Sequence, residues 1–212
     1  MTDPARVRTA YDAVAAPYAD ATVSEPAHPL DRAVLTAFAA RVGGPVLDVG
    51  CGPGHVTARL HDLGLAIAGL DLSPGMVAEA RRRHPGPVFS VGSMSDLPAG
   101  LGGLVSWYST VHTPDDELPG VLAGFAAALV PGGRLLVGFS VGDVPFRLDA
   151  AYGREVGLDF LRRRPDDVVA LLTEVGLRVE VRVERPADPD ERAPHAFLVA
   201  TRPHGAGEER LG

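Results

Sequence analysis

The sequence predicts an α/β fold in which a mostly parallel sheet carries helices on both faces and ends in an antiparallel pair of strands. Two short apolar runs, 45–49 and 65–70, are each followed by a polar turn and then by a segment with helical spacing. The last part of the chain instead alternates apolar and polar residues over 177–184 and 196–201, which is typical of a hairpin. Strands that alternate with helices favour parallel pairing in the first part of the sheet.

Length and composition fit one domain with a substantial core. The chain has 212 residues, of which 46% are hydrophobic, and a chain of this size buries about 70% of its unfolded surface. We expect a single domain over residues 1–203, followed by a polar tail over 204–212. No apolar run is long enough to span a bilayer, and the N-terminal residues contain no apolar signal-peptide segment, so a cytoplasmic location is expected.

The charged residues and the cysteine exclude several kinds of chemistry. The net charge of −7 argues against broad, phosphate-driven binding to nucleic acid. All 20 basic residues are arginine, which excludes mechanisms that use a lysine amine, including Schiff-base catalysis, pyridoxal-phosphate anchoring and a Walker A loop. Cys51 is the only cysteine, which excludes an intramolecular disulfide and a cysteine-based structural zinc site. No metal site is predicted.

The first strand leads into a glycine-rich turn formed by Gly50, Gly52 and Gly54. Glycine leaves room for a ligand to lie against the backbone and accepts a positive φ, and the start of the next helix offers unpaired N–H groups. The second strand, 65–70, is followed by Asp71, placed where a carboxylate can bind the two hydroxyls of a ribose. Together these features predict a nucleotide-binding turn.

Spacing, glycine and proline define the other elements. Pro17 is expected to end the first helix because proline has no N–H to donate. Ser73 is expected to cap another helix, with Pro74 in its first turn. The least periodic segment is 140–163. The remaining predicted elements are helices over 7–20, 30–42, 73–83, 118–130 and 165–175, and strands over 87–91, 103–107 and 134–139.

The glycine turn and two later segments resemble class I S-adenosylmethionine-dependent methyltransferases, in particular small bacterial enzymes that act on small molecules. Residues 48–54 resemble their first motif, in which an acid precedes Gly-x-Gly-x-Gly, and residues 70–76 and 129–136 follow in the family's order. A lone glycine motif is weak evidence, but ordered matches over 7–202 are strong. The resemblance implies a Rossmann-like, seven-stranded sheet, S-adenosylmethionine as cofactor and S-adenosylhomocysteine as its product.

The same resemblance implies roles for the motif residues. Asp48 is expected to act on the cationic amino-acid end of the cofactor, directly or by ordering the loop; the alternative is that it only braces the turn. The three glycines are expected to cradle the cofactor, with Cys51 as a small residue inside the turn. Asp71 is expected to fix the ribose, and Leu72 and Met76 of the same segment also count as cofactor residues.

Two tyrosines near the N-terminus resemble the family's Tyr-Asp-x-x-Ala-x-x-Tyr segment, which folds over the cofactor. Tyr11 is expected to contact the cofactor and Tyr18 the substrate, within a helical lid over residues 1–42. The alternative is that both rings only anchor a terminal helix to the core.

The third strand is followed by a departure from the family pattern. Ser93 and Met94 stand where the family commonly has Asp-Ala, so the carboxylate that accepts from the adenine amino group is missing. The adenine is expected to stack on Met94 and to bond to the backbone at Met94 and Ser95. A second departure is the pair 102–103, two glycines where the family often has Phe-Asp.

The fourth strand leads into the most informative stretch on the substrate side. Trp107, the only tryptophan, and Tyr108 leave the sheet at its carboxyl end, where open α/β sheets bind ligands. Their rings are expected to wall the cationic sulfur, with Tyr108 also a catalytic and substrate residue. His112 is a candidate general base and substrate contact because imidazole titrates near neutrality; alternatively, it caps the turn before Pro114.

Residues 140–163 correspond to the segment that covers the substrate in the family. Arg147 and Tyr152 are therefore expected to contact substrate, and Arg154 and Glu155 are weaker candidates of the same kind, because loop charges are usually solvated.

These observations predict methyl transfer from S-adenosylmethionine to an oxygen or nitrogen of a small molecule, with oxygen slightly favoured and carbon left open. No nucleic-acid or membrane partner is expected, and the oligomeric state, monomer or homodimer, stays open. One alternative is a methyltransferase-like protein that binds S-adenosylmethionine without transferring its methyl group, for which the departures at Ser93 and 102–103 leave room. A nicotinamide-binding oxidoreductase is disfavoured by Asp48 ahead of the glycines and by the absence of lysine.

Overall fold

The computed structural model describes residues 3–22, 26 and 28–204. Its strands are β1 (Val46–Val49), β2 (Ile67–Asp71), β3 (Val88–Val91), β4 (Leu101–Trp107), β5 (Leu129–Ser140), β6 (Phe146–Ala151), β7 (Arg154–Phe160), β8 (Arg178–Arg185) and β9 (His195–Thr201). Its helices are α1 (Pro4–Ala21), α2 (Pro29–Ala39), α3 (His55–Asp62), α4 (Pro74–Arg83), α5 (Leu118–Ala128) and α6 (Pro165–Glu174). The predicted polar tail, apart from His204, lies outside the described residues.

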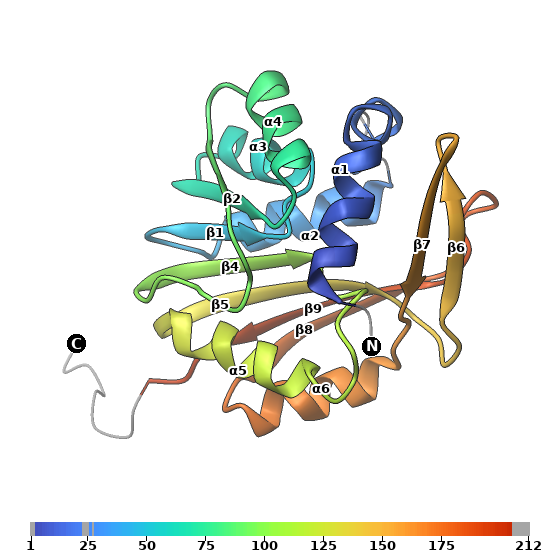
Figure 1. Ribbon diagram of the computed structural model, residues 1–212. Coiled ribbons are helices and arrows are strands. Elements are labelled where there is room, and N and C mark those ends of the chain that lie inside the picture. Colours follow the sequence, from blue (N-terminus) through green and yellow to red (C-terminus); the bar gives the residue numbers. More distant parts are fainter. Residues whose placement is uncertain (1–2, 23–25, 27, 205–212) are drawn as a thin grey trace.

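Seven strands form one sheet in the order β3-β2-β1-β4-β5-β9-β8 (Figure 1). The pairs from β3 to β5 are parallel, and β9 runs antiparallel to both β5 and β8. This arrangement confirms the predicted seven-stranded, mostly parallel sheet with an antiparallel hairpin at its C-terminal end. The order of the chain reverses between β1 and β4, so their carboxyl ends border a crevice rather than a continuous edge.

Apolar side chains on the two faces of the sheet form two cores. Figure 1 shows α5 and α6 together on one face, where Phe125 and Leu172 are fully buried against β5. On the other face, α2 and α3 contribute Phe38 and Leu60 to a cluster with Phe197 of β9. Both faces of the central strands are therefore covered, which explains their continuous apolar runs in the sequence.

The first helix continues past Pro17, so the prediction that this proline ends it is wrong. Proline cannot donate within a helix, but the turn that follows it is held by packing: Ala19 is 1% exposed. The backbone N–H of Thr22 also donates to the carbonyl of Tyr18 at 3.0 Å. Burial of the last turn offsets the lost hydrogen bond, and α1 forms one continuous rod over the sheet edge.

The aperiodic segment 140–163 contains regular structure, the antiparallel hairpin of β6 and β7. Tyr152 and Gly153 form its two-residue turn, with φ of 52° and 73°. Positive φ at both central positions matches the twist of a hairpin. A register shift between Leu148 and Ala150 interrupts the alternation, which explains why the sequence shows no strand period here. The hairpin packs against α1 through Val156 and Leu158, and no helix within the described ranges could span a membrane.

Candidate active site

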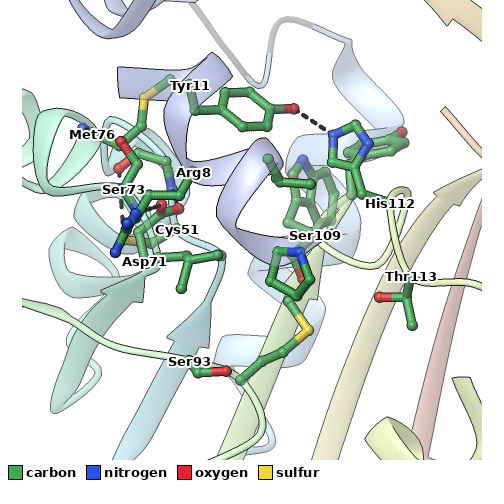
Figure 2. Close-up of a pocket in the computed structure, with 18 of the residues that line it drawn as sticks. Arg8, Tyr11, Cys51, Asp71, Ser73, Met76, Ser93, Ser109, His112 and Thr113 are labelled. Atoms are coloured by element: carbon green, nitrogen blue, oxygen red, sulfur yellow. Dashed lines mark hydrogen bonds between the residues drawn. The ribbon is translucent and has the colours of Figure 1, made fainter. Parts of the chain in front are cut away.

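A cavity lies at the carboxyl ends of β1, β2 and β4 and is bordered by α1. This is the point where the strand order reverses, the usual ligand position in open α/β sheets. The cavity brings together most of the residues predicted from the sequence, and Figure 2 labels several of them. The predicted residues that line it are Tyr11, Tyr18, Asp48, Gly50, Cys51, Gly52, Asp71, Leu72, Met76, Ser93, Met94, Ser95, Trp107, Tyr108 and His112.

The glycine turn gives the cavity a wall of bare backbone. Gly50 and Gly52 have φ of 68° and 54°, where other residues are strained. A Cβ at Gly50 would lie 2.4 Å from the Cβ of Ser109, whereas a Cβ at Gly52 would meet no atom within 4 Å. Backbone N–H groups of Gly50 and Cys51 donate to the carbonyl of Leu70 at 2.7 and 3.0 Å. The turn is therefore fixed to β2 and leaves open space beside Gly52.

Asp48 places a carboxylate at the end of β1, almost completely buried at 1% exposure. Its Oδ2 accepts a hydrogen bond of 2.6 Å from the hydroxyl of Thr57 on α3. Its Oδ1 is also buried, yet accepts from no group within the described part of the chain. Burial raises the pKa of Asp48 to about 7, although the bond from Thr57 opposes the change. A buried carboxylate oxygen without a partner is costly, so this position suits a ligand that supplies a cation or donors.

Asp71 ends β2 and braces the glycine turn from the other side. Its Oδ2 accepts from the Gly52 N–H at 2.8 Å, and its Oδ1 accepts from the Ser73 N–H at 2.8 Å. Burial raises its pKa, and these two backbone donors oppose the change. Each carboxylate oxygen can accept two hydrogen bonds, so both keep capacity for hydroxyl donors in the cavity.

Helix α1 is attached to one side of the cavity, the start of α4, through Asp12. Its Oδ1 accepts from the hydroxyl of Ser73 at 2.5 Å and from the N–H of Gly75 at 2.8 Å, both at the start of α4. A carboxylate at a helix N-terminus is favoured by the helix dipole. Ser73 also caps α4 as predicted, because its hydroxyl accepts from the Met76 N–H at 3.0 Å.

On the other side of the cavity, α1 meets the turn after β4. The hydroxyl of Tyr11 lies 2.9 Å from Nε2 of His112, as Figure 2 shows. His112 is 9% exposed, and its Nδ1 lies 2.8 Å from the backbone oxygen of Asp159 in β7. Burial lowers the pKa of His112, and burial raises the pKa of Tyr11. His112 therefore joins α1, the turn after β4 and the β6–β7 hairpin.

The two aromatic residues after β4 have different environments. Trp107 stacks on Phe197 with ring centroids 4.7 Å apart and belongs mainly to the core, although part of it reaches the cavity. Tyr108 has a φ of 55°, an uncommon value for a residue other than glycine. Its hydroxyl lies 2.6 Å from Nδ1 of His195 in β9. Tyr108 is thus held by a contact outside the cavity that its ring lines.

Three predicted residues do not line the cavity. Gly54 instead caps α3 with a φ of 86°, and a Cβ there would lie 2.7 Å from the ring of Phe89, so this glycine is needed for packing. Arg147 pairs with Asp159 at 3.0 Å on the outer side of the hairpin. Tyr152, at the hairpin turn, is 47% exposed and meets Tyr18 edge-on. The weaker candidates Arg154 and Glu155 also lie outside the cavity.

Sequence reasoning missed six polar residues of the cavity: His55 and Ser73, at the starts of α3 and α4, and Arg8, Ser109, Thr113 and Glu117. Arg8 precedes Tyr11 by one helical turn, and residues at this spacing share a helix face. The prediction that Tyr11 faces a ligand therefore also implied that Arg8 faces the same cavity. Ser109, Thr113 and Glu117 follow β4 in segments without a helical or strand period, and nothing in their spacing separates them from ordinary turn residues.

Comparison with known proteins identifies the domain that carries this site. Residues 46–133, which include the glycine turn, Asp71 and the turn after β4, match the family described as "Methyltransferase domain". This segment of the chain is similar to methyltransferase domains. The match begins after α1, which borders the cavity, and ends before the β6–β7 hairpin, so both of these elements lie beyond it.

Two curated relatives and one solved structure illustrate the likeness of this chain to methyltransferases. The chain is 38% identical over 109 residues to demethylmenaquinone methyltransferase of Beutenbergia cavernae, covering 50% of this chain and 45% of that one. It is 40% identical over 96 residues to trans-aconitate 2-methyltransferase of Methylobacterium nodulans, covering 43% and 36%. It thus spans less than half the length of these relatives.

The solved structure is the 1,6-didemethyltoxoflavin-N1-methyltransferase of Burkholderia thailandensis with bound 1,6-didemethyltoxoflavin and S-adenosylhomocysteine. It aligns with a TM-score of 0.74 at 23% identity, covering 94% of this chain and 88% of that one. The likeness shows that the methyltransferase fold extends beyond residues 46–133 to nearly the whole chain.

Proposed function

We propose that this protein transfers the methyl group of S-adenosylmethionine to an oxygen or nitrogen nucleophile of a small molecule. The observation that carries the proposal is the buried Asp48 Oδ1, which lacks a partner in the described chain and lies in the cavity of a methyltransferase domain. The cationic ammonium group of S-adenosylmethionine supplies what this oxygen lacks. When bound, the cofactor supplies a methyl group on a cationic sulfur.

The other cavity residues suit the remaining parts of the cofactor. Asp71 can accept from the ribose hydroxyls, since the two oxygens of a carboxylate together offer about four acceptor sites and the N–H groups of Gly52 and Ser73 take one on each oxygen. Open space beside Gly52 admits the ligand against the turn. Met94 and Ser95 line the part of the cavity that follows β3 and would contact the adenine, where Ser93 replaces the family's aspartate.

In this proposal the chain contributes mainly by holding the two reactants close and aligned in a site shielded from water. The rings of Trp107 and Tyr108 border the cationic sulfur. His112 accepts the proton of the nucleophile, a contribution that typically accelerates such steps without being obligatory. Helix α1 covers the cofactor side, and the β6–β7 hairpin holds His112 through Asp159.

The substrate and setting follow from the same features. We propose that residues 1–203 act as one domain, with 1–42 as a lid and 140–163 as a substrate cover that brings Arg147 and Tyr152 toward the acceptor. A small acceptor is supported by the net charge of −7 and by relatives whose names specify small molecules. We also propose a cytoplasmic location and a bacterial source, the second of which is supported by the bacterial sources of these relatives.

Calorimetric titration with S-adenosylmethionine and S-adenosylhomocysteine tests the proposal. We expect micromolar binding of both, and about tenfold weaker binding by Asp71→Asn because a charged acceptor is lost. Asp62→Asn is the matched control, since the side chain of Asp62 is 83% exposed and lies outside the cavity. If neither compound binds, the proposal fails. Binding of both without methylated product from any hydroxyl or amine would instead support the non-methylating alternative.

A further inference from the structure

The tautomer of His112 is set by its backbone partner. Nδ1 lies 2.8 Å from the carbonyl oxygen of Asp159, and a carbonyl oxygen only accepts hydrogen bonds, so Nδ1 carries the ring proton. Burial lowers the pKa of His112, which keeps the ring neutral near pH 7. Nε2 is therefore a bare acceptor, directed at the lid.

The group that donates to Nε2 is a phenol that belongs to the chain itself. The hydroxyl of Tyr11 lies 2.9 Å from Nε2, and Figure 2 shows the two side chains pointing toward each other from α1 and from the turn after β4. Because Nε2 has no proton, the O–H of Tyr11 is the donor. The hydroxyl of Tyr11 thus already bonds to Nε2 of His112, the proposed base, and Tyr11 belongs to α1, which borders the cavity.

The surroundings of this contact are aromatic. The ring of His112 packs against Phe160 with centroids 4.7 Å apart, and the ring of Tyr11 meets Tyr18 at 6.0 Å. Val156 and Leu158 of β7 are buried beside them. Edge-to-face contacts of this kind favour an aromatic ring over an aliphatic chain of similar size.

The charges that line the cavity disfavour an anionic acceptor at Nε2. Asp48 and Asp71 are both buried carboxylates in the same cavity. The cation that lines it, Arg8, has its guanidinium on the Asp71 side in Figure 2, away from His112. A carboxylate at Nε2 would have no proton to donate, and its electron-rich oxygen would face the lone pair of Nε2.

We propose that the methyl acceptor is a phenol, whose hydroxyl replaces that of Tyr11 on Nε2 of His112 when the lid moves aside. This inference rests on the proposed methyl transfer and assigns its acceptor class. The phenolic O–H bond breaks as the N–H bond to Nε2 forms, and the oxygen uses the electron pair it keeps to bond to the methyl carbon. The carbon–sulfur bond breaks at the same time and leaves its electron pair on the sulfur, which becomes a neutral thioether. Tyr11 then competes with the acceptor for one site.

Competition gives a test that does not depend on turnover. Tyr11→Phe removes the internal phenol and keeps the ring, so it should bind 4-methylphenol roughly 3- to 10-fold more tightly than the unmodified protein in calorimetric titration. Thr9→Val is the matched control: it removes an exposed hydroxyl from the same helix, outside the cavity, and should leave the affinity unchanged. Equal affinity of Tyr11→Phe and the unmodified protein would overturn the proposal.

Two further probes keep the test decisive if Tyr11→Phe folds poorly. In the unmodified protein, 4-methylphenol should shift the Nε2 resonance of His112, assigned by comparison with His112→Gln, and leave Nδ1 protonated. Binding of 4-methylbenzoate or 4-methylbenzylamine as tight as that of 4-methylphenol would overturn the assignment.

The two proposals can fail separately. If S-adenosylmethionine binds and 4-methylphenol does not, the proposed acceptor class is wrong and the proposed methyl transfer still stands. If S-adenosylmethionine does not bind, both proposals fail.

Discussion

Asp48 is expected to make cofactor binding depend on pH. Its carboxyl group has a pKa of about 7 because it is buried, so at pH 6 it is mostly protonated in the free protein. A bound ammonium group would stabilise the carboxylate and lower this pKa, which means that the complex holds fewer protons than the free protein. Binding is therefore expected to tighten as the pH rises from 6 toward 7.

The expected result is the release of roughly one proton when S-adenosylmethionine binds at pH 6. Calorimetry in two buffers with different ionisation enthalpies measures it. Asp48→Asn keeps the size of the side chain and an acceptor for the Thr57 hydroxyl, and should release no proton while binding the cofactor more weakly. Proton release that persists in Asp48→Asn would show that another group titrates and that Asp48 only braces the turn.

The residue scale also marks the limit of sequence reasoning about the site. The motif located Asp48 and Asp71, since each follows directly from a strand end and its turn. It did not reveal that Thr57 occupies one oxygen of Asp48 and leaves the other without a partner. Nor did it reveal the hydrogen bond between the Tyr11 hydroxyl and Nε2 of His112, because that contact joins a helix and a turn that are distant in the sequence.

At the scale of elements, local patterns predicted most helices and strands, and long-range packing decided the exceptions. Ser73 and Pro74 define the start of α4 within one turn of chain. Helix α1 continues beyond Pro17 because its last turn, which includes Ala19, is buried against the rest of the fold. The turn of the β6–β7 hairpin uses Tyr152 at positive φ, a position where asparagine or glycine would have signalled a turn.

The glycines that begin β4 have a packing explanation. A Cβ at Gly102 would lie 1.7 Å from the carbonyl oxygen of Gly43, and one at Gly103 would lie 2.7 Å from Val42 Cγ1. The Gly102 N–H also donates to the carbonyl of Pro45 at 2.8 Å. The loop before β1 therefore crosses directly over β4, and this departure from the family pattern does not itself favour a non-methylating protein.

Gly102→Ala should destabilise the protein by about 1–3 kcal/mol or more, because the close backbone contact must open. Urea denaturation measures the change. Gly120→Ala in α5 is the matched control: a Cβ there meets no atom within 4 Å, and alanine should add up to ~1 kcal/mol of stability in a helix. A Gly102→Ala protein that is fully stable yet binds S-adenosylmethionine differently would give Gly102 a functional role instead.

At the scale of the molecule, a buried ion cluster joins α2 to the end of the sheet. Arg185 is 4% exposed, and its guanidinium pairs with Asp31 at 2.7 Å and with Glu191 at 2.5 Å. Glu191 lies 3.3 Å from His195, whose other ring nitrogen meets Tyr108. Hydrogen bonding to Arg185 lowers the pKa of Glu191 to about 2. The cluster thus connects the C-terminal hairpin to Tyr108, whose ring lines the cavity.

Arg185→Met should lower the free energy of unfolding at pH 7 by about 3–5 kcal/mol, because it leaves the buried carboxylate of Asp31 and the partly buried one of Glu191 without their cation. Glu191 is stabilised as a carboxylate in the unmodified protein, so this contribution persists until the pH falls below its unfolded pKa of about 4.5. Without Arg185 this contribution of Glu191 is lost, so the difference between the two proteins should stay constant from pH 7 to pH 5 and shrink only below about pH 4.5 in urea denaturation. Arg182→Met, which breaks exposed pairs on the same strand, should cost less than ~1 kcal/mol. Equal losses in both variants would show that the cluster adds nothing beyond surface pairing.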